Sequence, residues 1–184
     1  MPPRLLVAHT TRLFQASGDD LLAYADDQVN QGLWFLVSTS EELFALRDAE
    51  VPLGERVACI RSMSTLFERV FATRCTPHLS HRSEAGASAL NLVCYMWWDI
   101  LPLCGRPKDP ASSPMDSACL DAMERSLALP SVACQESALH GLGHWALYYP
   151  ERCSKAVDTF LDAQPQLPVA LVKYAKCARK GGVM

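Results

Sequence analysis

Apolar residues recur every three or four positions over long stretches of the chain, which predicts amphipathic α-helices. In residues 19–37 this pattern follows Ser17 and Gly18, which we interpret as a helix start. The apolar positions of this segment are Leu22, Ala25, Val29, Leu33, Leu36 and Val37. A second apolar stripe predicts a longer helix that ends near Arg74, and its members are Val57, Ile60, Met63, Phe67, Val70 and Phe71.

Prolines divide the second half of the chain into shorter helices. Ser113, followed by Pro114, is typical of a helix start, and Pro130 predicts where that helix ends. Further helices are expected over residues 131–148, 150–161 and 168–180. A helix over residues 88–103 would be apolar on nearly every face, but it is shorter than the roughly 20 residues that a membrane-spanning helix needs. We therefore expect an all-α protein in which residues 88–103 form a central buried helix.

Composition narrows the classes of function. The chain has 17 basic and 20 acidic residues and a net charge of −3, which argues against a nucleic-acid partner and against attachment to an anionic membrane. The apolar run at the N-terminus is too short for a secretory signal. Most of the eight cysteines fall within apolar helical patterns and none forms a Cys-x-x-Cys pair, so we expect reduced thiols in a cytoplasmic protein.

A weak internal repeat indicates how the helices are organised. Five positions recur at a spacing of 34 residues: Cys119, Ala122, Met123, Glu124 and Leu127 correspond to Cys153, Ala156, Val157, Asp158 and Leu161. In the second helices of the hairpins, Ser-Ala-Leu-Asn at 88–91 matches Ser-Ala-Leu-His at 137–140. A period near 34 is typical of stacked helical hairpins. We predict one domain, residues 1–184, in which residues 84–184 form a short α-solenoid and residues 1–83 form an irregular helical part.

The segment Ser-Ala-Leu-His-Gly-Leu-Gly-His-Trp at 137–145 resembles the second helix of the HEAT-like repeats found in phycobilisome-lyase-type proteins. Over the other helical hairpins only the helix spacing and the small-residue positions agree with that family, and the first half of the chain hardly resembles it. Trp145 and Gly141 depart from the family pattern, which has an aliphatic residue and alanine there. The resemblance implies a non-enzymatic scaffold that binds a protein partner along a concave surface.

Stacking the hairpins in register predicts where such a partner would bind. His140 and His144 lie on one flank of their helix, because residues four apart share a face. The matching register would bring residues of the 88–103 helix and one lysine of the last helix to the same surface. The predicted binding groove consists of Asn91, Tyr95, Trp98, Asp99, His140, His144 and Lys176. Alternatively, the two histidines fill a seam between helices, and Asp99 is a hydrogen-bonded structural carboxylate.

Metal binding is the rival hypothesis. Cys75, His78 and His81 offer three metal ligands at a spacing of three residues, although the local sequence holds no fourth. Zinc bound there, or by the pair His140 and His144, would make the chain a metal-dependent enzyme or a metal-stabilised domain. An ordinary loop over residues 75–81 is the alternative. A third hypothesis is that the chain is a homo-oligomer or a helical subunit of a larger complex.

Overall fold

The computed structural model describes residues 1–38, 41–164 and 166–183. Within these residues the chain is helical and has no β-strand, which confirms the all-α prediction. The elements are α1 (Pro3–Asp20), α2 (Asp26–Ser38), α3 (Glu41–Phe44), η1 (Ala45–Arg47), α4 (Leu53–Leu66), η2 (Phe67–Phe71), α5 (Ala72–Arg74), η3 (Ser80–Arg82), α6 (Leu90–Ile100), α7 (Ser113–Leu127), α8 (Val132–Trp145), α9 (Pro150–Ala163) and α10 (Val169–Ala178).

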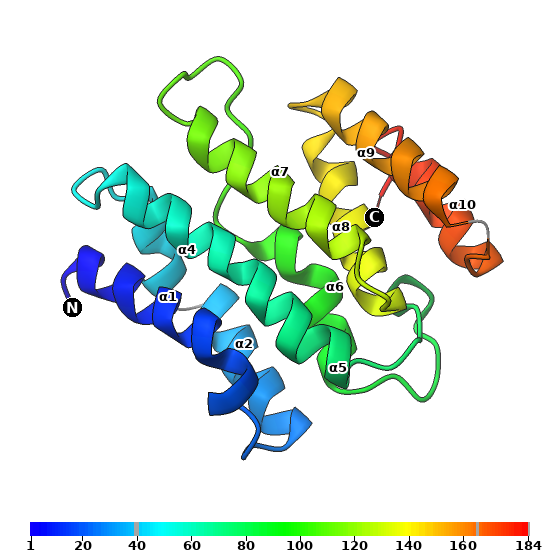
Figure 1. The fold of residues 1–184 in the computed structure, drawn as a ribbon, viewed down its shortest axis with the longest axis horizontal. Helices are drawn as coiled ribbons and strands as arrows, with labels where there is room; N and C mark the ends of the chain where they lie inside the picture. Colours follow the sequence, from blue (N-terminus) through cyan, green and yellow to red (C-terminus); the bar gives the residue numbers. More distant parts are fainter. Residues whose placement is uncertain (39–40, 165, 184) are drawn as a thin grey trace.

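The long helices lie in two layers (Figure 1). In the front layer α1 packs along α4 and α4 packs along α7, while α9 lies beyond α7 and makes only limited contact with it. In the second layer α2 packs against α6, α6 against α8, and α8 against α10. Both halves of the chain therefore contribute to both layers.

Aromatic side chains fill the space between the layers. Phe14 of α1 and Phe71 each place their ring centroid 5.9 Å from that of Trp97 of α6. Phe67 stacks on Trp98 at 5.5 Å and meets Phe71 edge to face at 5.0 Å. All five side chains are at most 2% exposed. They belong to one buried apolar cluster that extends along the chain from Leu6 to Ala178.

The first helix differs from the prediction. The helix expected over residues 19–37 is present as α2 but begins only at Asp26, because α1 continues to Asp20. Ser17 does not start a helix; its buried hydroxyl donates a hydrogen bond to the carbonyl of Phe14 inside α1. Proline instead marks the start of α1, with Pro3 in its first turn.

The other helices begin and end close to the expected positions. The helix ending at Arg74 is present as α4, η2 and α5, with a π-helical turn over Phe67–Phe71. Ser131 caps α8 by accepting a hydrogen bond from the backbone of Cys134, and Pro150 opens α9. The apolar segment 88–103 contains α6, which is buried along most of its length. None of the described helices has the length and apolar character needed to cross a membrane.

Two glycines of α8 lie close to different segments of the chain. A Cβ added at Gly141 would lie 2.6 Å from Cβ of Trp98, inside the core. A Cβ added at Gly143 would lie 2.5 Å from a methyl group of Val183, in the segment after α10. Trp98 is stacked on Phe67 within the buried core, so the absence of a side chain at Gly141 lets α8 approach α6 this closely.

We predict that Gly141→Ala lowers the free energy of unfolding by about 1–3 kcal/mol, the usual result of overpacking a core. The clash outweighs the roughly 1 kcal/mol that alanine adds to helix stability. Gly143→Ala should cost less than Gly141→Ala, because Val183 can shift. Urea unfolding of both variants checks this expectation. If Gly141→Ala were as stable as Gly143→Ala, Gly141 would not determine the distance between α6 and α8.

Candidate functional site

The site is built on the contact between α6 and α8. Ser137 of α8 donates its hydroxyl hydrogen bond to the carbonyl of Cys94, and one turn later Gly141 packs on Trp98. Both pairs are 43 residues apart in sequence, so the contact repeats with each turn of the two helices. This regular contact fixes the neighbouring row of side chains.

That neighbouring row brings together four of the predicted site residues. The rings of Tyr95 and His140 have centroids 4.2 Å apart. One turn further on, Nε2 of His144 lies 3.4 Å from Oδ1 of Asp99 and 3.3 Å from Nε2 of His140. Tyr95 and His140 fill a seam between the helices, since they are 6% and 1% exposed, whereas Asp99 and His144 lie at its solvent-facing end.

The third helix of the site is α10, and Tyr174 is its contribution. The Tyr174 hydroxyl lies 2.6 Å from Nδ1 of His140 and 3.1 Å from the hydroxyl of Tyr95. Burial, helped by the nearby His144, lowers the pKa of His140 to about 4, so this ring is neutral at pH 7. Burial and the contact with Tyr95 raise the pKa of Tyr174 well above its usual range.

A buried carboxylate attaches the 75–89 loop to this cluster. Glu136 of α8 is 0% exposed and accepts hydrogen bonds from the backbone nitrogens of Ser80, at 2.8 Å, and His81, at 2.9 Å. Its Oε1 also lies 2.6 Å from Nδ1 of His81. The His81 ring stacks on Tyr174 at 4.3 Å. Glu136 therefore positions the loop, and the loop in turn packs against Tyr174.

Three of the predicted groove residues lie elsewhere. Asn91 is buried and holds the loop, since its side chain accepts from the Thr76 nitrogen and donates to the carbonyls of Thr76 and His78. Trp98 is part of the aromatic core. Lys176 is exposed on α10, whereas Tyr174 is the α10 residue that reaches His140.

The cause of this difference is the register of α6 and α8. The sequence match pairs Asn91 with His140, whereas the structure pairs Tyr95 with His140. The helices therefore meet one turn away from the register that the match predicts. Because Asn91, Tyr95, Trp98 and His140 are buried, they are not presented to a partner as an open groove.

The structure does not bring the predicted metal ligands Cys75, His78 and His81 together as one group of ligand atoms. His81 is turned to Glu136, and Nδ1 of His78 lies 2.8 Å from the Thr76 hydroxyl. The thiol of Cys75 is instead beside that of Cys94. The three side chains have three different partners, so equal spacing in sequence does not give them a common target.

A different set of three can hold a metal ion. Within residues 1–38, 41–164 and 166–183, the ligand atoms of Asp99, His140 and His144 form the one group of three such residues close enough to share an ion. These atoms all lie within 4.8 Å of one another. Two histidines and one carboxylate can bind a transition-metal ion as three protein ligands.

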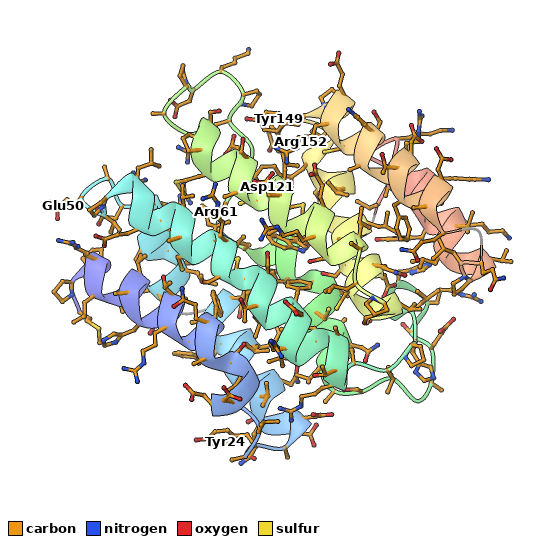
Figure 2. All side chains as sticks on the ribbon, in the orientation of Figure 1. Tyr24, Glu50, Arg61, Asp121, Tyr149 and Arg152 are labelled. Atoms are coloured by element: carbon orange, nitrogen blue, oxygen red, sulfur yellow. The ribbon has the colours of Figure 1, made fainter. Side chains whose placement is uncertain are left out.

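The second candidate is a groove in the front layer, between α7 and α9. Its volume is about 440 Å³, within the size range of ligand pockets. Leu127, Ala156 and Phe160 give it an apolar floor. At one end Arg152 reaches from α9 to Asp121 of α7 (Figure 2), with the two charged groups 2.6 Å apart. Arg152 also pairs with Glu124 at 2.8 Å.

We predict that Glu136→Ala lowers the free energy of unfolding by about 2–4 kcal/mol, because two buried backbone donors lose their acceptor. Glu136→Gln should cost less, since its amide oxygen can still accept one of these bonds. Limited proteolysis should also cut the 75–89 loop faster in Glu136→Ala. The control is the exposed Glu50→Ala, which should stay within about 0.5 kcal/mol of the parent chain. A Glu136→Ala protein as stable as this control would contradict the anchoring role.

Comparison with known proteins gives no match to a family model, to a curated protein or to a solved structure. The likeness of residues 137–145 to HEAT-like repeats therefore remains an interpretation of those residues.

Proposed function

We propose that this chain is a short HEAT-like α-solenoid that acts as a non-enzymatic adaptor and binds a segment of a partner protein in the groove between α7 and α9. The order of the layers supports the solenoid. The first helices α1, α4 and α7 follow one another in one layer, and the second helices α2, α6, α8 and α10 follow one another in the other. In solenoids the binding surface is formed by such successive helices.

The observation that carries the proposal is the opening between α7 and α9. The earlier front-layer helices pack along one another, whereas α7 and α9 separate and leave apolar side chains at the floor of a groove. An amphipathic helix places apolar residues at this kind of groove and keeps its polar face in water. The expected occupant is therefore a helical segment with one apolar face.

The rim of the groove indicates the charge of that segment. Arg152 is already paired with Asp121 and Glu124 across the groove. Lys155 is exposed beside it, and no described residue forms an ion pair with it. An acidic side chain on the partner helix would complement Lys155 and steer its approach.

The cysteines bear on where the adaptor works. All eight are free thiols, and the buried ones are Cys59, Cys94, Cys119, Cys134 and Cys153. Free thiols persist in a reducing compartment, so we infer a cytoplasmic location. A second copy of this chain is the alternative occupant of the groove, and sedimentation at increasing concentration would reveal it as a dimer.

We predict that labelled helical peptides with apolar residues at positions i, i+3, i+4 and i+7 bind this chain, measured by fluorescence anisotropy. Peptides with acidic flanks should bind more tightly than peptides with basic flanks. Ala128→Glu places a carboxylate on the exposed edge of the groove. It should lower the affinity for peptides with acidic flanks by about tenfold, which corresponds to about 1.4 kcal/mol. Lys155→Glu should reverse the flank preference.

The matched control is Ala23→Glu, which adds the same charge at an exposed alanine just after α1, outside the groove. It should leave peptide affinity unchanged. Peptide binding that neither Ala128→Glu nor Lys155→Glu alters would refute the groove, as would the absence of binding by every amphipathic peptide of the panel.

A further inference from the structure

We propose that Asp99, His140 and His144 form a binding site for a divalent first-row transition-metal ion, with zinc as the reference ion. The site lies in the second layer, on the seam between α6 and α8, whereas the proposed partner groove lies between α7 and α9. It is therefore a separate property of the chain, and either proposal can fail without the other.

The distances between the ligand atoms match those of a coordinated ion. Zinc binds histidine nitrogen and carboxylate oxygen at about 2.0–2.2 Å, so two ligands of a tetrahedral ion are about 3.3 Å apart. Nε2 of His144 lies 3.3 Å from Nε2 of His140 and 3.4 Å from Oδ1 of Asp99. Two edges of the tetrahedron are thus already in place. The third edge, between Asp99 and His140, is no longer than 4.8 Å, and a rotation of the exposed Asp99 side chain would shorten it.

Hydrogen bonding alone accounts poorly for this arrangement. A neutral imidazole carries one N–H, so Nε2 of His144 cannot donate to His140 and to Asp99 at once. Both contacts are also longer than the 2.9–3.0 Å that N–H hydrogen bonds prefer. A metal ion between the three atoms would use the lone pairs of both rings and the carboxylate together.

The surroundings of His140 are those of a metal ligand. Ligating histidines usually hold their other ring nitrogen in a hydrogen bond, which fixes the ring and its tautomer. Nδ1 of His140 lies 2.6 Å from the Tyr174 hydroxyl, which leaves Nε2 to face His144. Tyr174 is held in turn by the hydroxyl of Tyr95 at 3.1 Å and by the stacked ring of His81 at 4.3 Å. Tyr174 is therefore a positioning residue for the site.

The site is open to solvent on one side. The side chains of His144 and Asp99 are 38% and 35% exposed, so an ion can enter without unfolding the seam. Three protein ligands leave one tetrahedral position for water or for a group of a bound molecule. His140, 1% exposed, closes the inner side.

The test is calorimetric titration of the full chain with ZnCl₂, in a background in which the two exposed thiols are removed by Cys104→Ser and Cys177→Ser. We expect one ion per chain. His144→Ala and Asp99→Asn should each weaken binding by more than tenfold, and both residues are exposed enough for the fold to survive. Tyr174→Phe should weaken binding by about 10- to 100-fold, as loss of a supporting hydrogen bond does at other sites.

Two control variants make the result specific. His9→Ala removes an exposed histidine of α1, and His78→Ala removes a histidine of the loop set that does not converge. Neither should change the affinity for zinc. Cobalt in place of zinc should give the visible absorption of a four-coordinate ion in the parent background and lose it in His144→Ala.

Equal zinc affinity in the parent background and in His144→Ala or Asp99→Asn would overturn the proposal, and so would the absence of stoichiometric binding. Loss of binding in His78→Ala would move the ion to the loop and would overturn it as well. Circular dichroism of each variant, compared with the parent, separates loss of a ligand from loss of the fold.

Discussion

The close approach of α6 and α8 is the constraint on which the structure depends. Gly141 has no side chain, and the Cβ of Trp98 occupies the space that a side chain there would take. Ser137 adds a buried hydrogen bond to the carbonyl of Cys94 on the same line of contact. Trp98 is itself fixed by Phe67 from the front layer. Small residues on one helix and large ones on the other thus set both the distance between the helices and their register.

This register determines what the chain can do. With Gly141 on Trp98, the next row of side chains places His140 against Tyr95 and His144 against Asp99. Tyr174 and the loop held by Glu136 close around the buried end of the row. The register of α6 and α8 does not constrain α7 and α9 in the front layer. The groove between these two helices offers a surface for another molecule. The two candidate sites therefore arise on different layers from one packing arrangement.

The sequence alone was sufficient to predict the helices whose ends are marked by local signals. Pro114, Ser131 and Pro150 act on their own first turns, so α7, α8 and α9 begin close to the expected residues. Helix α1 was missed because buried Thr10 and Ser17 interrupt its apolar stripe. The predicted register of α6 against α8 was wrong by one helical turn. A match between repeats identifies equivalent positions, whereas side-chain size decides which positions are in contact. Glu136 and Tyr174 were missed because their partners, the 75–89 loop and His140, lie far away in sequence; Tyr174 does follow His140 by the repeat spacing of 34 residues.

The most direct test of this account is the register of α6 and α8 in solution. For a chain of 20.3 kDa, nuclear Overhauser contacts between assigned rings measure it without any substitution. Ring centroids 4.2 Å apart predict strong contacts between the protons of Tyr95 and His140, together with contacts from the Gly141 α-protons to the Trp98 ring. Contacts between the Asn91 side-chain amide and the His140 ring, with none from Tyr95, would show the helices one turn away and would contradict the account.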